Sequence, residues 1–296
     1  MATYVEARTI EDAVHAVAGG ARPIAGGTDL VVGARQGKKP LPEALVGIHR
    51  IAGLCDITAD GGSIRLGTLA THAAITAHPA IRARWTALAD ASAIVGSHAT
   101  RANGTIGGNV MNASPAMDTG APLLCFAATA LLRGPNGARR VLLEQLWTGP
   151  GTTSATDELL VGIDLPPLPD GTGSAYVRLQ YRRQMEIAIV GVGTAVTMAG
   201  GVITDARLAI TALAPTIHRV EPAEARLVGT PGDRPAADAA AALAAEAAAP
   251  ISDVRGSAGY RRAMAAVMAR RAIEAAVTRA GGGTVEIPAS DSTYGS

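Results

Sequence analysis

The chain has 296 residues, of which 48% are hydrophobic and 17% charged, so it is long and apolar enough for two folded cores and is not disordered as a whole. Its 26 basic and 25 acidic side chains leave a formal charge of +1, and only 3% of the residues are aromatic. This composition argues against binding to nucleic acid or to an anionic membrane, and two cysteines are too few for a disulfide framework or an iron–sulfur cluster.

The first third of the chain predicts a mixed α/β unit. Residues 9–18 have helical spacing, with Thr9 as the N-cap residue and Asp12 completing a capping box. A short strand, a Gly26-Gly27 turn and a helix that opens at Thr28 come next. The other elements predicted here are a buried strand over 44–48, a hairpin at Asp60-Gly61-Gly62, and helices over 72–77 and 81–93.

The middle of the chain predicts a domain boundary. A strand over 159–165 is stopped by two prolines, and the stretch 166–174 is rich in Pro and Gly. We therefore predict a first domain over 1–170, in two pieces of about 1–55 and 56–170, and a second domain over 174–281. We expect residues 282–296 to form a flexible tail.

The second domain predicts antiparallel strands followed by helices. Residues 187–198 and 202–213 are apolar and flank Ala199-Gly200-Gly201, which is typical of a hairpin. Alanine-rich residues 235–250 and residues 257–280 predict two helices. We see no secretory signal and no apolar run long enough to span a membrane, so we expect a cytoplasmic protein.

The first Gly-Gly pair lies between a short strand and a helix start, in Ile24-Ala25-Gly26-Gly27-Thr28-Asp29-Leu30. Glycine permits positive φ and lets a ligand approach the main chain closely. Free amides at a helix start carry a partial positive charge, which suits a phosphate or diphosphate. The alternative is an ordinary tight turn with Thr28 as the N-cap residue.

A second pair lies in Thr105-Ile106-Gly107-Gly108-Asn109, and Pro115 and Asp118 follow it. The Thr and Asn side chains can donate hydrogen bonds to anionic oxygens. Asp118 can accept a hydrogen bond from a ribose, as acidic residues do in dinucleotide sites. The alternative is a surface loop in which Asp118 is a turn or cap residue.

Other catalytic motifs do not emerge from the sequence. It has no GxxxxGK[ST] segment, which disfavours nucleoside triphosphate hydrolysis. Residues 191–196 lack the third glycine of a dinucleotide fingerprint and favour a plain strand. The six histidines show no metal-ligand spacing, so we predict no metal site on this chain.

Together, these motifs resemble the FAD-binding medium subunit of the molybdenum hydroxylase family, which includes the flavoprotein subunits of carbon monoxide dehydrogenase and the FAD segment of xanthine dehydrogenase. The resemblance covers most of the chain. Glu186 stands where the family usually has Asp, and Arg178 where it often has Lys. The segments that carry the resemblance are residues 25–30, residues 105–109 with Pro115 and Asp118, Glu158-Leu159-Leu160, Tyr176-Val177-Arg178 with Arg182 and Ile187-Ala188, and residues 252–255 with Tyr260-Arg261-Arg262.

The resemblance implies an α+β fold with bound FAD. A vanillyl-alcohol-oxidase-type FAD-binding domain in two α/β pieces would precede a C-terminal domain of antiparallel strands and helices. No side chain is expected to be catalytic, because a flavin carries its own redox chemistry. The cofactor-binding residues that we predict are Ile24, Ala25, Gly26, Gly27, Thr28, Asp29, Leu30, Thr105, Ile106, Gly107, Gly108, Asn109, Asp118, Leu160 and Arg178.

Each of these residues has an expected part. Main-chain amides at the four glycines and at Thr28 would meet the diphosphate, with the side chains of Thr105 and Asn109 as further donors. Asp118 would hold a ribose hydroxyl, and Arg178 would contact the flavin. Three apolar side chains would cover the rings, namely Ile24, Ile106 and Leu160.

The resemblance also implies partners. A large subunit would carry a molybdenum-pterin cofactor and a small subunit two iron–sulfur clusters, the whole arranged as a dimer of heterotrimers. This chain would pass electrons to an external acceptor. A stand-alone FAD oxidoreductase of the same fold and a non-enzymatic nucleotide-binding scaffold module are the alternatives. Carbon monoxide, purines, N-heterocycles and aldehydes all stay open as substrates of the complex.

Overall fold

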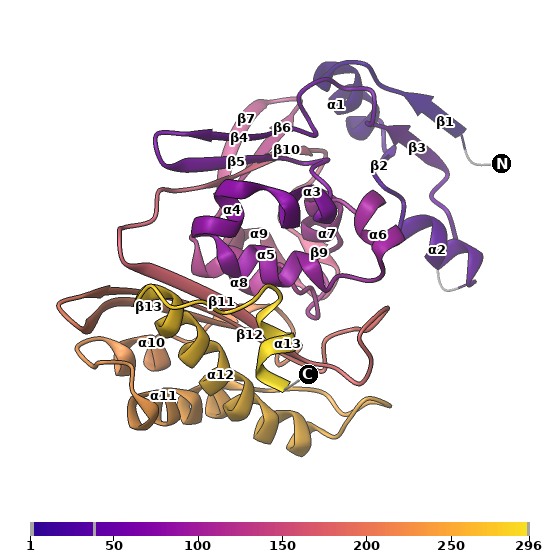
Figure 1. Cartoon of the computed structure of the whole chain (residues 1–296). Coiled ribbons are helices and arrows are strands. Elements are labelled where there is room, and N and C mark those ends of the chain that lie inside the picture. Colours follow the sequence, from indigo (N-terminus) through magenta and orange to yellow (C-terminus); the bar gives the residue numbers. More distant parts are fainter. Residues whose placement is uncertain (1–2, 38–39, 295–296) are drawn as a thin grey trace.

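The N-terminal part is a small parallel sheet with a helix packed on it (Figure 1). The computed structural model describes residues 3–37 and 40–294, and the side chains of these up to residue 291. The predicted capping box is confirmed, because the Thr9 hydroxyl accepts from the Asp12 amide while the Asp12 carboxylate accepts from the Thr9 amide. The elements are β1 (Thr3–Glu6), α1 (Ile10–Ala18), β2 (Arg22–Ile24), α2 (Leu30–Arg35) and β3 (Ala44–Gly47), in the sheet order β1-β3-β2.

A five-stranded antiparallel sheet forms the second piece, in the order β4-β5-β10-β6-β7. The predicted hairpin is confirmed, since Asp60 pairs with Ser63 and both intervening glycines have positive φ. Short helices between β5 and β6 lie on one face of this sheet (Figure 1). The elements are β4 (Ile57–Asp60), β5 (Ser63–Gly67), α3 (His72–Ala77), α4 (Pro79–Arg84), α5 (Thr86–Ala93), α6 (His98–Asn103), α7 (Ile106–Asn112), α8 (Gly120–Cys125), β6 (Thr129–Gly134), β7 (Gly137–Leu142), α9 (Leu143–Leu146), β8 (Trp147–Gly149), β9 (Thr152–Thr153) and β10 (Leu159–Leu165).

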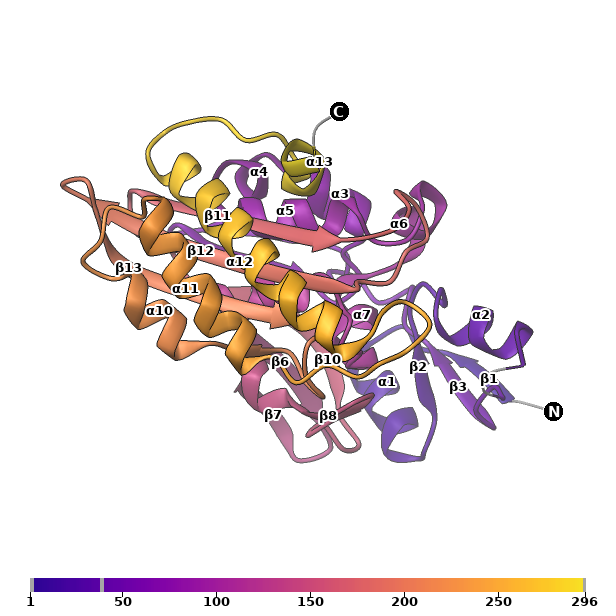
Figure 2. The same cartoon turned by 90° about the horizontal axis from the view of Figure 1, so that it is seen from below.

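The C-terminal part is a four-stranded antiparallel sheet in the order β11-β12-β13-β14. The long helices cover one face of it, as Figure 2 shows from below, and α5 and α8 contact its strands from the N-terminal part. The predicted hairpin at Ala199-Gly200-Gly201 is confirmed. The elements are β11 (Thr172–Leu179), β12 (Val190–Ala199), β13 (Val202–Thr211), β14 (His218–Arg219), α10 (Glu221–Leu227), α11 (Arg234–Ala247), α12 (Ala258–Ala280) and α13 (Ala289–Tyr294).

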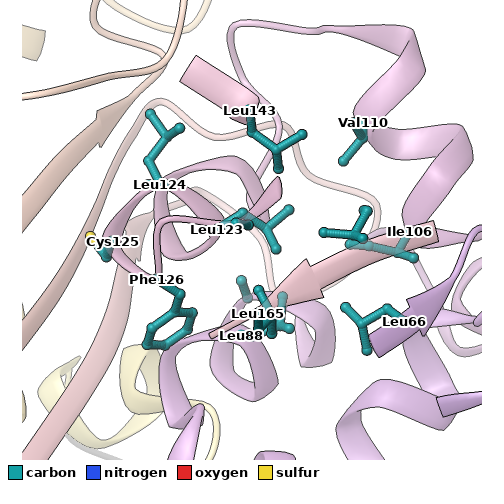
Figure 3. Packing of buried hydrophobic residues seen from close by; sticks show 14 of the residues in the cluster. Leu66, Leu88, Ile106, Val110, Leu123, Leu124, Cys125, Phe126, Leu143 and Leu165 are labelled. Carbon is teal, nitrogen blue, oxygen red and sulfur yellow. The ribbon is translucent and has the colours of Figure 1, made fainter. Parts of the chain in front are cut away.

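The largest apolar core lies between the five-stranded sheet and its helices. Leu66 and Leu165 of the sheet face Leu88, Ile106 and other helical side chains in this cluster (Figure 3). The cluster continues into the C-terminal part through buried residues of β11, β12 and β13. The arrangement confirms the predicted α+β class. No helix in the described ranges is both long and apolar enough to cross a bilayer.

Two helix predictions need correction. The helix expected over 81–93 is two helices, because the backbone leaves the helical region at Trp85, whose side chain is 2% exposed. The helix expected to open at Thr28 begins at Leu30, with Asp29 at the N-cap position and no side-chain cap. Thr28 therefore belongs to the turn rather than to the helix.

The segment after residue 281 is not the flexible tail that we expected. It folds back over β11 and ends in α13 (Figure 2). Ala289 is fully buried and its amide donates to the Asp90 carboxylate at 2.9 Å. Arg279 also binds Asp90 and the carbonyl oxygens of Val285 and Glu286. Hydrogen bonds to one buried ion pair thus hold the segment, and residues 295–296 of the expected tail lie outside the described residues.

Candidate functional site

The two glycine loops lie against each other, although they are about eighty positions apart in the sequence. A methyl group built on Gly26 would lie 1.8 Å from the carbonyl oxygen of Asn103, so only glycine allows this close approach. A methyl group on Gly104 would lie 3.4 Å from both Thr28 Oγ1 and His72 Cδ2. The structure therefore brings the first loop into contact with the residues that lead directly into the second.

The first loop, residues 25–29, has free main-chain donors. Gly27 has φ of +67°, and its carbonyl oxygen accepts from the Val31 amide at 2.9 Å. Within the described ranges, the amides of Gly26, Gly27 and Thr28 donate no hydrogen bond to the protein. Gly26 is exposed, and Gly27 and Thr28 are half-buried, so these amides are available to an anion.

The second loop, residues 104–109, uses its amides inside the protein. Thr105 caps α7, because its hydroxyl oxygen accepts from the Gly108 amide at 3.1 Å. The Gly107 amide donates to the carbonyl oxygen of Thr68 at 2.9 Å. Both amides are thus bonded within the protein in this structure, and their contact with a diphosphate stays a prediction.

Gly107 is required by packing. A methyl group built on it would lie 1.8 Å from Thr68 Oγ1 and 2.6 Å from the Thr68 carbonyl oxygen. Gly108, by contrast, is exposed, and a methyl group there would meet only Thr105 Oγ1, at 3.0 Å. The two glycines of this pair thus differ, the first fitting against β5's end and the second facing outward.

The predicted apolar cover separates into two groups. Ile106 and Leu160 are 0% and 2% exposed and belong to the large core cluster, where Figure 3 shows Ile106 pointing at Leu66. These two side chains support the loop from within the core in this structure, and their contact with the rings stays a prediction. Ile24 is half-buried beneath Gly27, and its contact with the cofactor stays a prediction.

Asn109 keeps one donor group for a ligand. Its Oδ1 accepts from Thr119 Oγ1 at 2.7 Å, which fixes the orientation of the amide. Among the described side chains and main chain, nothing accepts from Nδ2. The predicted role of Asn109 as a side-chain donor is compatible with this arrangement and stays a prediction.

Asp118 and Arg178 form a buried ion pair that joins the segment between α7 and α8 to β11. Arg178 Nη1 lies 2.7 Å from Asp118 Oδ2, and the Tyr176 hydroxyl donates to Asp118 Oδ1 at 2.8 Å. Burial raises the pKa of Asp118, while the guanidinium beside it acts in the opposite direction. Arg178 also binds Gln180 and the Glu186 carbonyl oxygen. Both residues are thus engaged within the protein, and their ribose and flavin contacts stay predictions.

Two residues that the sequence did not single out lie at the junction of the loops. His72 is 2% exposed and its Nδ1 has no hydrogen-bond partner among the described residues. Burial and the charge of Arg101 lower the pKa of His72 to about 4, so it is neutral at pH 7. Arg101 is 9% exposed and forms no ion pair with any described residue. The only signal for Arg101 in the sequence was a basic residue four positions before Thr105, and its burial is visible only in the fold.

These residues fit a diphosphate-containing cofactor in part. An anion is stabilised by oriented amides and by cationic side chains, and among the described residues the junction has three amides without a protein partner and one buried arginine, Arg101, without a carboxylate partner. Gly26 is exposed, although its α-carbon lies against the Asn103 carbonyl oxygen.

Comparisons with known proteins identify the family of this chain. The family model described as "FAD binding domain in molybdopterin dehydrogenase" matches residues 1–168, and "CO dehydrogenase flavoprotein C-terminal domain" matches residues 174–276. The carbon monoxide dehydrogenase medium chain of Afipia carboxidovorans is 37% identical, over 88% of this chain and 90% of the relative. A putative xanthine dehydrogenase FAD-binding subunit of Escherichia coli is 31% identical, over 95% of this chain and 98% of the relative.

Solved structures show the same fold. A chain of reconstituted CO dehydrogenase from Oligotropha carboxidovorans superposes with a TM-score of 0.90 at 35% identity, over 94% of this chain and 98% of that one. A chain of quinoline 2-oxidoreductase from Pseudomonas putida 86 gives a TM-score of 0.87 at 26% identity, over 95% and 98%. This chain therefore belongs to the FAD-binding medium subunits of the molybdenum hydroxylase family, a family of oxidoreductase subunits.

Proposed function

We propose that this chain is the electron-transfer subunit of a heteromeric molybdenum hydroxylase and passes electrons from iron–sulfur clusters on a partner subunit to an external acceptor. The observation that carries the proposal is the contact between the first loop and the start of the second, where Gly26 lies against Asn103. Free amides at this junction supply donors for the diphosphate of FAD. Relatives named as medium chains of such dehydrogenases support the assignment.

The part of this chain in the reaction is to bind and orient the cofactor. FAD, when bound, supplies the redox chemistry. The first-loop amides would hold its diphosphate, and Asn109 would add a side-chain donor. The Asp118–Arg178 pair fixes β11 against the second loop and so keeps the two sides of the site at a constant distance. No side chain of this chain is needed as an acid, a base or a nucleophile.

Several finer statements belong to the same proposal. We propose a large molybdenum-cofactor subunit and a small iron–sulfur subunit as partners, arranged as a dimer of heterotrimers, in the cytoplasm. We also propose that the chain divides into a first domain over residues 1–170 and a second over residues 174–281. The relatives are named for carbon monoxide, xanthine, nicotine derivatives, nicotinate and glyceraldehyde, so the substrate class of this complex stays open.

The test is purification of the complex from its native cells, followed by flavin extraction and anaerobic reduction. We expect two co-purifying subunits, extractable FAD, and flavin bleaching by one of carbon monoxide, a purine, an N-heterocycle or an aldehyde. The isolated chain should bind FAD but stay oxidised with each of these. Bleaching of the isolated chain by a substrate would favour a stand-alone FAD oxidoreductase, and absence of FAD from both preparations would favour a nucleotide-binding scaffold.

A further inference from the structure

The edge of the C-terminal sheet is closed by side chains rather than by a further strand. β11 comes first in the order β11-β12-β13-β14, so one row of its main-chain groups faces away from β12. In this row the Tyr176 amide donates to Asp90 Oδ2 at 3.1 Å, and the Arg178 amide donates to Ser290 Oγ at 3.0 Å. Buried edge amides without acceptors cost free energy, so these side chains complete the strand.

Two parts of the chain that are far apart in sequence supply these acceptors. Asp90 lies on α5 in the FAD-binding part, and Ser290 lies on α13 in the C-terminal segment, residues 282–291 (Figure 2). Both side chains are fully buried, and the Ala289 amide donates to Asp90 Oδ1 at 2.9 Å. The segment follows residues 174–276 and so lies outside the part that the C-terminal family model matches.

One buried arginine ties the C-terminal segment to β11. Arg279, near the end of α12, binds the two oxygens of the Asp90 carboxylate at 2.7 and 3.0 Å. It also donates to the Ser174 carbonyl oxygen of β11 at 2.7 Å and to the Val285 carbonyl oxygen of the segment at 3.0 Å. Because the guanidinium is planar and rigid, this one side chain fixes α5, β11 and the segment relative to one another.

The strand that is held in this way carries Arg178, one of the predicted FAD-binding residues. Its guanidinium pairs with Asp118 of the FAD-binding part at 2.7 Å, and the Tyr176 hydroxyl donates to the same carboxylate at 2.8 Å. The main-chain amides of the same two residues are bound by Ser290 and Asp90. The C-terminal segment therefore fixes the main chain from which the Arg178 side chain extends.

We propose that the C-terminal segment positions Arg178 for the cofactor by holding the edge of β11 against the FAD-binding part. Ser290 is then a positioning residue that acts through Arg178. This inference rests on the proposed function, because it needs FAD in the site and Arg178 beside the flavin. A guanidinium beside a flavin favours the negative charge that reduction adds, so its position affects both FAD affinity and the reduction potential.

The experiment measures FAD affinity and the flavin reduction potential of the full-length chain for wild type, S290A and S290W. S290A removes the hydroxyl that accepts from Arg178, and S290W places an indole at a fully buried position and so displaces the segment. The controls are S252A and S252W, because the Ser252 hydroxyl also accepts from a main-chain amide, that of Ala258 at 2.9 Å, although Ser252 is exposed.

Both readouts should change in the two Ser290 variants. We expect FAD affinity to fall about threefold to tenfold in S290A, as for one lost hydrogen bond, and further in S290W. The reduction potential should be lower in both, because the guanidinium no longer keeps its place beside the flavin. S252A and S252W should match wild type in affinity and in potential.

The outcomes separate the inference from the function on which it rests. Wild type that binds no FAD would overturn both. Wild type that binds FAD while the Ser290 variants match it in affinity and potential, or are only less heat-stable, would overturn the inference and leave the proposed function standing. Weaker binding with an unchanged potential would mean that the segment supports the fold without positioning Arg178, and would also overturn the inference.

S290A decides the test if S290W does not fold or if the two variants disagree. Alanine keeps nearly the volume of serine and removes only the hydroxyl oxygen, so the chain should fold with its core intact. A lower affinity and a lower potential in S290A alone would support the inference, and an S290A chain that matches wild type in both would overturn it.

Discussion

The two Gly-Gly pairs look alike in sequence and perform different physical tasks. The first, Gly26-Gly27, is a loop that lies against Asn103 and whose amides have no partner among the described residues. The second, Gly107-Gly108, starts a helix whose amides are bonded to Thr68 and Thr105. A glycine pair therefore indicates close approach to the main chain, but only the fold shows whether a ligand or another part of the protein makes that approach.

The largest expected effect concerns the Asp118–Arg178 pair, which, like Gly107 and Gly108, is bonded within the protein. Asp118→Ala would leave the guanidinium of Arg178 buried without its carboxylate, and we expect a loss of about 3–5 kcal/mol in the free energy of unfolding. Urea denaturation of the chain without flavin measures it. Asp170→Ala, which breaks an exposed pair with Arg84, is the control and should cost less than about 1 kcal/mol. A stable D118A chain that has lost only FAD affinity would instead support the ribose contact.

A second effect concerns His72, beneath the junction. Its pKa is about 4 in the folded chain, below the 6.5 of an exposed histidine, because of burial and the charge of Arg101. As the pH falls from about 6.5 to about 4, the unfolded chain takes up a proton that the folded chain does not, so stability falls by up to about 3 kcal/mol. Urea midpoints across this range should show the loss in wild type and a smaller one in His72→Gln. Parallel pH curves for the two would contradict the assignment.

The third prediction compares the two glycines of the second pair. Gly107→Ala places a methyl group against the Thr68 backbone and should cost about 2 kcal/mol or more by overpacking. Gly108→Ala faces solvent near Thr105 and should change stability by less than about 1 kcal/mol. Thermal unfolding without flavin measures both. Equal stability of the two variants would mean that Gly107 does not have the packing role assigned to it.

The smallest effect concerns Thr28, which belongs to the first loop, where the amides can bind a ligand. Thr28→Ala should leave the stability of the flavin-free chain within about 0.5 kcal/mol, because the hydroxyl makes no hydrogen bond to any described group. FAD affinity should fall about fivefold to tenfold, as expected for the loss of one hydrogen bond worth about 1 kcal/mol. Thr28→Ser restores the hydroxyl and should restore the affinity. A T28A chain that binds FAD as tightly as wild type would show that the hydroxyl is not a ligand.

Local signals predicted the elements well. The hairpin at Asp60, the capping box at Thr9 and the strand Leu159–Leu165 depend on neighbours in the sequence, and all three are confirmed. The split at Trp85 was not predictable, because alanine-rich residues on both sides favour an unbroken helix and tertiary packing of the indole interrupts it. The helix after residue 281 was not predicted, because the hydrogen bonds that hold this polar segment run to Asp90, which is far away in the sequence.

The candidate site was likewise predictable only in part from the sequence. The glycine motifs identified both loops, and their contact at Asn103 fulfils what the resemblance implied about their position. The sequence could not show that Thr68 occupies the Gly107 amide, since that partner lies thirty-nine positions earlier. It also could not show that Arg101 is buried with no carboxylate beside it among the described residues, while Arg178 has one.

Amide hydrogen exchange of the flavin-free chain, with and without added FAD, tests the central claim most directly. The amides of residues 26–28 should exchange fast alone and become strongly protected when FAD is bound, because they gain acceptors on the diphosphate. Those of Gly107 and Gly108 should be protected in both states. First-loop amides that exchange at the same rate with and without FAD, while the flavin is demonstrably bound, would contradict the account.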